Sequence, residues 1–240
     1  MSAADSQSPF RSRGFIVAAI VVGAIVLAAI VVLVTSLLGA GDNNNADPTP
    51  APTTSTSADP GSADPSVCGL EGFEETSSLT TAPENEWELV GTMAAPVDDR
   101  SGPGDVAAGG FRSCFAHTAE GALFAAVNFV ATGTDATLGP RLVELVAPGP
   151  GRDAIEAQSS GGSASNLRAQ VAGFKVSAYS ADAATIDLAL NYSGGELVSV
   201  PLKLVWVEGD WKVEMTDAGE LPLAPAQIQN LGGYTPWSGA

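Results

Sequence analysis

The amino-acid sequence predicts an α+β domain that follows an N-terminal transmembrane helix. Three observations indicate this class. Residues 15–38 form a run of 24 residues without a charge. Between residues 118 and 158, apolar residues recur at helical spacing, and through residues 170–215 apolar and polar residues alternate as in half-buried strands. Helices followed by a run of antiparallel strands are typical of an α+β protein.

Composition narrows the classes of function. The chain has 240 residues, with 27 acidic and 10 basic ones, for a formal net charge of -17. This charge argues against direct nucleic-acid binding, because phosphate backbones are bound by clustered Lys and Arg. One His and two Cys leave few groups for metal binding or acid–base chemistry. We therefore expect no enzyme activity, no cofactor and no metal site.

The apolar run Phe15–Leu38 is long enough for a membrane anchor. As a helix it would rise about 36 Å, against a hydrocarbon core of about 30 Å. A cleaved signal peptide is the alternative, but its apolar region normally has about 7–15 residues. Arg11 and Arg13 precede the run, which predicts a cytoplasmic N-terminus (1–14) and an extracellular C-terminal domain on a single-pass cell-membrane protein.

A polar segment follows the predicted helix. Residues 39–66 are rich in Pro, Thr and Asp and have almost no large apolar side chains, so they cannot offset the entropy of ordering. We expect a disordered linker. Within the membrane run, Ala19 and Gly23 form a small-xxx-small pair that is compatible with a homo-oligomer.

The two cysteines, Cys68 and Cys114, both lie on the predicted exported side. An oxidising compartment favours their pairing as a disulfide. Closing the loop between them would stabilise the fold by about 4 kcal/mol in the chain-entropy model. A reactive or metal-binding pair would need a nearby base or further ligands. Residues 67–114 are thus a disulfide-stapled extension, with a strand at 87–90 and a long mobile loop at 96–110.

Three helices are expected next. Thr118 is the predicted N-cap of the first, Gly133 ends it, and one apolar face is formed by Leu123, Phe124, Val127 and Val130. Pro140 fits the first turn of a second helix that Pro148 closes. A weaker helical stretch covers residues 152–158.

Four strands follow in the expected order of a meander. Residues 170–179 and 186–192 come first; residues 196–207 and 210–215 follow across the turn Glu208-Gly209-Asp210. Pro201 has no N–H to donate, so we expect an edge, a bulge or a strand break there.

This order of elements resembles the nuclear transport factor 2-like cone fold over residues 115–218. The final turn followed by DWKV, at 210–213, supports the resemblance. The chain also resembles uncharacterised single-pass proteins of actinobacterial conjugative and integrative elements. The residues that carry this second resemblance are WELVGTMAAP at 87–96, RSCFAHTAEGALFAAVN at 112–128, VWVEGDWKV at 205–213 and NLGGYTPWSGA at 230–240.

The resemblance implies a function of assembly. The layout is similar to the bitopic assembly factors of type IV secretion and conjugation machines, whose partners are other membrane or secretion-machine proteins. The cone fold also occurs in isomerase-type enzymes and small-ligand binders, which is the alternative. In that case Tyr179 and Tyr192 would line the pocket, and His117, which precedes the predicted cap, would be the general base rather than a helix-entry residue.

The polar residues of the strands and turns, and the C-terminal tail, remain to be placed. Asp182, Asp187 and Asp210 are expected to be solvated, the first and last in turns and Asp187 on the wet face of its strand. The tail 219–240 contains apolar residues without a period. Either it folds back over the domain's own sheet, or Tyr234 and Trp237 anchor a neighbouring subunit.

Overall fold

The structure is a computed structural model, and it describes residues 65–159 and 168–239. All of these belong to one compact unit of the chain. The predicted cytoplasmic end (1–14), transmembrane helix (15–38) and nearly all of the linker (39–66) lie outside the described residues. Within the described ranges, no helix is long and apolar enough to cross a membrane.

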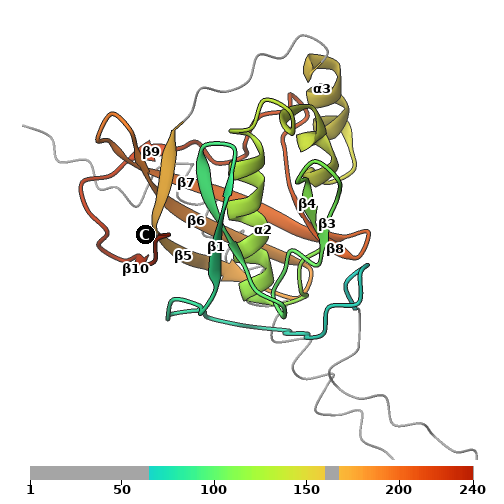
Figure 1. The fold of residues 1–240 in the computed structure, drawn as a ribbon, viewed down its shortest axis with the longest axis horizontal. Coiled ribbons are helices and arrows are strands. Elements are labelled where there is room, and N and C mark those ends of the chain that lie inside the picture. The colour runs from blue at the N-terminus through green and yellow to red at the C-terminus, as the bar shows by residue number, and fades with distance from the viewer. Residues whose placement is uncertain (1–64, 160–167, 240) are drawn as a thin grey trace, which may run out of the picture. The chain divides into compact units, whose positions relative to one another are not determined.

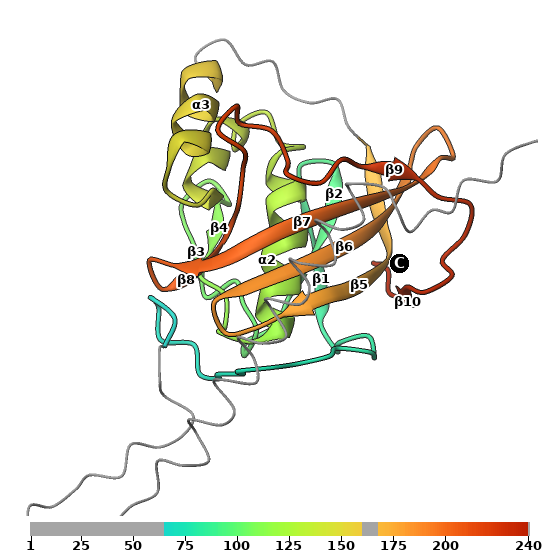
Figure 2. The ribbon, with the colours of Figure 1, turned by 180° about the vertical axis from the view of Figure 1, so that it is seen from behind.

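A central helix lies between a two-stranded hairpin and a larger antiparallel sheet (Figure 1). Seen from behind, the larger sheet lies in front of the helix (Figure 2). Helices precede the sheet in the chain, so the predicted α+β class is confirmed.

The hairpin consists of β1 (Glu86–Val90) and β2 (Met93–Val97), which pair antiparallel. Its two-residue turn begins at Gly91, whose φ of +57° lies in the left-handed region that favours glycine. The predicted strand at 87–90 is therefore confirmed.

The predicted mobile loop at 96–110 is only partly a loop. Its first two residues belong to β2, and β3 (Asp105–Val106) pairs with β4 (Arg112–Ser113). Ser101 and Gly102, at its centre, are buried. The sequence MAAPV has no clear alternation, and it is a strand because β1 pairs with it along its whole length.

The central helix is α2 (Ala119–Thr132). Thr118 caps it by accepting a hydrogen bond from the Gly121 N–H, and Gly133 is the C-cap, as predicted. Leu123, Phe124 and Val127 are buried and Val130 is partly buried. The opposite face is buried as well, because β2 packs against it, which the apolar stripe alone did not indicate.

The two following helices are short. Residues Gly139–Leu145 form a 3-10 helix, η2, with Pro140 in its first turn, instead of the α-helix that we predicted. Seven residues bounded by glycine and an extended Val146 are too few for α-helical hydrogen bonds to propagate. The third predicted helix is confirmed as α3 (Pro150–Ser159).

The larger sheet has six strands. Its main path runs β10-β5-β6-β7-β8, and β9 also pairs with β7. The strands are β5 (Ala169–Tyr179), β6 (Ala183–Tyr192), β7 (Leu197–Val207), β8 (Asp210–Val213), β9 (Ala226–Gln227) and β10 (Thr235–Pro236). All pairs are antiparallel, so the predicted meander is confirmed.

Pro201 lies inside β7 without breaking it. It is paired with Asp187 of β6 on one side. On the other side β9 pairs with residues 198–199 and β8 with residues 204–207, so Pro201 lies in the gap between them. Of the three alternatives, the structure shows a locally exposed edge, where a missing N–H costs no ladder hydrogen bond.

Residues 67–114 share the hydrophobic core with the rest of the unit. Val90, Met93 and Phe111 belong to the same buried cluster as Phe124 and Leu188. The predicted disulfide between Cys68 and Cys114 is confirmed, and it ties the start of the described chain to the entry of α2. The predicted boundary at 114/115 therefore does not separate two cores.

Candidate functional site

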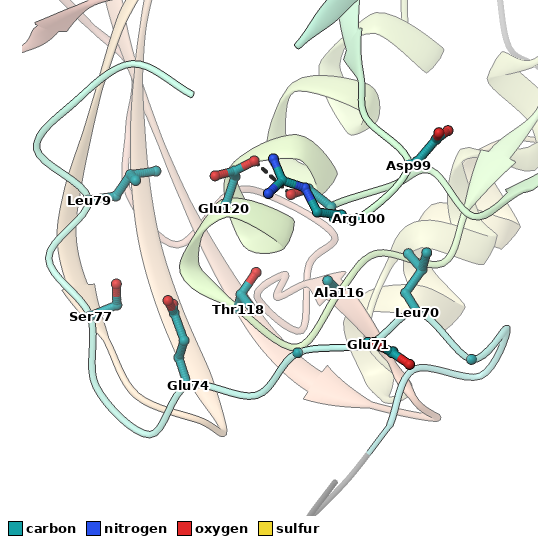
Figure 3. A pocket seen from close by; sticks show the side chains of 13 residues that line it. Leu70, Glu71, Glu74, Ser77, Leu79, Asp99, Arg100, Ala116, Thr118 and Glu120 are labelled. Carbon is teal, nitrogen blue, oxygen red and sulfur yellow. Dashed lines mark hydrogen bonds between the residues drawn. The ribbon is translucent and has the colours of Figure 1, made fainter. Parts of the chain in front are cut away.

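A groove of about 640 Å³ opens where segment 69–79, loop 99–101 and the start of α2 meet (Figure 3). Its lining combines leucine side chains with charged groups. The charged groups are Glu71, Glu74, Asp99, Glu120 and Arg100.

Two of the carboxylates are held by the fold. Glu74 Oε2 accepts a hydrogen bond from the Ala119 N–H at 2.9 Å, at the N-terminus of α2. Glu120 Oε1 accepts one from the Ser101 hydroxyl at 2.6 Å (Figure 3). A carboxylate is favourable here because the first N–H groups of a helix have no intrahelical acceptor and carry partial positive charge.

The remaining charges of the groove face solvent. The Arg100 side chain is 82% exposed, and its Nε lies 3.6 Å from Asp98 Oδ1. Glu71 and Asp99 are exposed. The groove therefore offers carboxylate acceptors next to apolar side chains, an arrangement suited to a cationic or hydrogen-bond-donating surface of another molecule.

The structure does not bring together Tyr179 and Tyr192, the two tyrosines expected to line a pocket. Tyr192 pairs with Ala169 and Tyr179 with Ala184, so the two tyrosines lie at opposite ends of the β5–β6 pair. Tyr192 lines a separate cavity of about 460 Å³ with Thr92 and Arg168.

Tyr179 is half-buried and linked to the backbone. Its hydroxyl donates to the Glu74 carbonyl at 3.1 Å and lies 3.4 Å from the His117 carbonyl. Burial, and then the neighbouring Glu74 carboxylate, raise the pKa of Tyr179 well above its ordinary value. This hydroxyl positions the chain that leads into α2.

His117 is part of an aromatic cluster. It is 2% exposed, and its ring stacks on Trp206 with centroids 3.8 Å apart and an interplanar angle of 6°. Phe73 and Trp211 contact it edge-on, and its Nε2 lies 2.6 Å from the Ala181 carbonyl. The imidazole thus fills space beneath the start of α2, as expected for a helix-entry residue.

Asp210 is not solvated, contrary to our prediction. It is 1% exposed. Its carboxylate accepts hydrogen bonds from the backbone N–H groups of Cys114 and Phe115, and Lys212 Nζ lies 3.1 Å away. The turn is Glu208-Gly209, and Asp210 is the first residue of β8, where the segment before α2 covers its side chain. Asp182, the other aspartate that we expected to be solvated in a turn, is exposed as predicted.

The prediction for Asp187 is also wrong. Asp187 is half-buried rather than solvated, because Tyr234 of the tail lies over it, although Asn191 on the same face is exposed. Asp187 accepts hydrogen bonds from the Ser199 hydroxyl at 2.7 Å and from the Tyr234 hydroxyl at 2.8 Å. Burial, and the carboxylate of Asp187, raise the pKa of Tyr234.

Trp237 lies in the domain's own core. It is 6% exposed, and its ring contacts Trp87, Phe124 and Phe174. Its Nε1 donates to Asn85 Oδ1 at 3.0 Å. With β9 and β10 paired to the sheet, the tail folds back over the domain, which is the first of the two alternatives.

The groove was not predicted from the sequence, although the sequence contains one signal of an acidic surface. Residues 14–99 contain twelve acidic residues and no Lys, Arg or His. The ion pair between Arg112 and Glu88, which joins β4 to β1, was not predicted either. In the described part of the chain, no three His, Cys, Asp or Glu side chains are grouped to hold a metal ion.

Comparison with known proteins gives a family and no function. No curated protein and no solved structure matches the chain. A family model does match residues 47–236, which is most of the chain, and its description is a domain of unknown function. The match includes the hairpin, α2, the larger sheet and most of the tail. The chain therefore belongs to the family described as Domain of unknown function (DUF8175).

Proposed function

We propose that this protein is a non-enzymatic, single-pass membrane protein whose exported domain mediates protein–protein assembly, as a component of a conjugative transfer machine. The observation that carries the proposal is the groove at the start of α2. Its exposed carboxylates lie beside apolar side chains. Such a surface suits recognition of a basic protein segment better than chemistry on a small molecule.

The membrane topology is supported by the sequence. The uncharged run at 15–38 follows Arg11 and Arg13, and the next basic residue is Arg100. The disulfide between Cys68 and Cys114 suits an oxidising compartment outside the cytoplasm.

We infer further that the exported domain is a variant of the nuclear transport factor 2-like cone. The order of helices before a four-strand meander that ends in DWKV supports this inference. The hairpin β1–β2 and the long tail would then be additions that cover α2 and the outer face of the sheet.

The alternative is a small-ligand-binding or isomerase-type enzyme. It requires titratable groups that converge on one pocket. The positions of Tyr179, Tyr192 and His117 give it less support, because the tyrosines lie at opposite ends of two strands and the imidazole is packed between aromatic rings.

The test is affinity capture of the full-length protein after crosslinking in its native cells. We expect secretion ATPases, channel subunits or other transfer proteins in the captured material. A charge-reversed variant of two exposed groove residues, Glu71→Lys with Asp99→Lys, should lose most of this capture.

The matched control makes the same charge change on α3, where Asp153 and Glu156 are exposed. The variant Asp153→Lys with Glu156→Lys should capture partners as the unmodified protein does. The proposal is wrong if the full-length protein stays monomeric, captures nothing reproducibly, and its deletion leaves transfer of the element unchanged.

A further inference from the structure

In the part of the chain that the structure describes, the outer edge of β1 is an unpaired strand edge. The hairpin there is a two-stranded sheet, in which β1 pairs with β2. Three of its five residues, Glu86, Glu88 and Leu89, are exposed. An open edge presents a row of backbone donors and acceptors that a further strand can pair with.

The register shows which backbone groups face outward. Leu89 is paired with Ala94 and Trp87 with Pro96. The Ala94 N–H donates a hydrogen bond to Gln170 Oε1, and the Pro96 carbonyl accepts one from Asn128 Nδ2. These backbone groups of β2 therefore point away from β1. Leu89–Ala94 and Trp87–Pro96 are therefore non-hydrogen-bonded pairs. In an antiparallel ladder, both residues of a non-hydrogen-bonded pair point their N–H and C=O groups away from each other.

The N–H and C=O groups of Trp87 and Leu89 therefore face away from β2, along the outer edge. Within residues 65–159 and 168–239, no hydrogen bond to these outward groups is present. The two edges of the hairpin thus differ. Side chains of β5 and α2 form hydrogen bonds with the outward backbone groups of β2, whereas no described residue does so with those of β1.

The side chains on this edge also indicate a binding surface. Leu89 is 74% exposed, which exceeds the exposure of Val67, Val106 and Leu223, the other exposed large apolar residues among those the structure describes. The N-terminal end of the edge is acidic, with Glu84 and Glu86 next to Glu88. Of these, Glu88 is paired with Arg112.

These charges decide which strand can pair there. A second copy of segment 84–90 would bring three more carboxylates against the three already present, which disfavours self-pairing. A segment with Lys or Arg at alternate positions would place its charges opposite the glutamates and an apolar residue against Leu89.

We propose that the outer edge of β1 is a docking site for an extended, basic segment of a partner protein, which pairs with Trp87 and Leu89 as an added strand. The inference rests on the proposed function, because it names the kind of segment through which assembly occurs. Main-chain hydrogen bonds supply the pairing, and the glutamates supply the preference for a basic segment.

The experiment uses a substitution that changes only the outward edge. Leu89→Pro removes the outward N–H, and it costs no β1–β2 hydrogen bond because this N–H does not face β2. Leu89→Thr is the matched control, since it keeps the N–H and suits a strand. Far-UV circular dichroism and the melting temperature establish that both variants are folded.

The probe is a synthetic heptapeptide of alternating lysine and valine, added to the full-length protein in detergent. We expect binding to weaken about tenfold in Leu89→Pro and by no more than about threefold in Leu89→Thr. An N-methylated peptide of equal charge, and a glutamate–valine peptide, should bind about tenfold more weakly or not at all. Bound peptide should slow hydrogen exchange at the Leu89 amide.

Equal binding to the unmodified protein and to Leu89→Pro would overturn the inference, because attraction to the acidic surface alone would then explain it. Failure of the unmodified protein to bind the probe would overturn it as well. Neither result affects the proposed function, which is tested by capture in native cells. If partners are captured there by Leu89→Pro as efficiently as by the unmodified protein, assembly stands and this edge is not its site.

Discussion

The carboxylate of Asp210 accepts a hydrogen bond from the backbone N–H of Cys114, with Oδ2 3.0 Å from the nitrogen. The residues are 96 positions apart in the chain. The adjacent Phe115 N–H donates to the other carboxylate oxygen at 2.9 Å. One aspartate at the start of β8 thus holds the disulfide-bonded segment against the sheet, immediately before α2 begins.

Replacing Asp210 should destabilise the domain strongly. In Asp210→Asn, Lys212 loses its partner while its side chain is only 11% exposed, and we expect a loss of about 3 kcal/mol in the free energy of unfolding. Urea denaturation monitored by tryptophan fluorescence measures this. Asp182→Asn is the control, with a change below about 0.5 kcal/mol. Equal effects of the two substitutions would show that the buried position of Asp210 is wrong.

The disulfide should contribute a large part of the stability. Removing it with the double substitution Cys68→Ser and Cys114→Ser should cost about 4 kcal/mol, because it closes a loop with a sequence separation of 46. Denaturation with and without a reductant gives the comparison. The reductant should shift the midpoint of the native protein and leave that of the double variant unchanged. An unchanged native midpoint would contradict the stabilising role.

Trp237 should behave as a core residue. Trp237→Ala should lower the free energy of unfolding by about 4 kcal/mol, because a large buried side chain leaves a cavity among Trp87, Phe124 and Phe174. In comparison, Tyr234→Phe removes one hydrogen bond to Asp187 and should cost about 1 kcal/mol. If Trp237→Ala were as stable as the native protein but lost its partners, the anchoring alternative would replace the one described above.

Tyr179 should make the domain sensitive to alkali. Because burial raises its pKa above the ordinary 10.0, the folded state resists ionisation that the unfolded state undergoes. The stabilisation is complete below pH 10 and is lost as the pH rises above it. The stability difference between the native protein and Tyr179→Phe, about 1 kcal/mol at neutral pH, should shrink above that pH.

Denaturation curves between neutral pH and pH 12 test this prediction, with Tyr192→Phe as the control. The Tyr192 hydroxyl makes no hydrogen bond within the described residues, so that variant should follow the native protein across the range. A constant difference between the native protein and Tyr179→Phe would refute the prediction.

Several elements were predictable from local sequence. Thr118 and Gly133 bound α2 because a cap is decided by the residues next to it. The meander from β5 to β8 followed from alternation and from the Glu208-Gly209 turn. The η2 segment was misassigned because apolar spacing does not distinguish seven residues of 3-10 helix from α-helix.

The site residues were less predictable for a physical reason. Asp187 lies on the face of β6 opposite Ile186 and Leu188, as its alternation indicated. Alternation separates two faces of a strand, but it does not tell whether a distant segment covers the second one. Tyr234 covers it here from 47 positions away.

The sequence by itself determined the α+β class, the ends of α2, the order of the meander strands β5 to β8 and the cysteine pairing, since each depends on neighbouring residues or on a single available partner. Only the tertiary structure decided that Asp210 and Trp237 are buried, that Glu74 and Glu120 share a groove, and that no other described strand pairs with the outer edge of β1. These facts depend on contacts between segments far apart in the chain, and local periodicity contains no information about which distant segments meet.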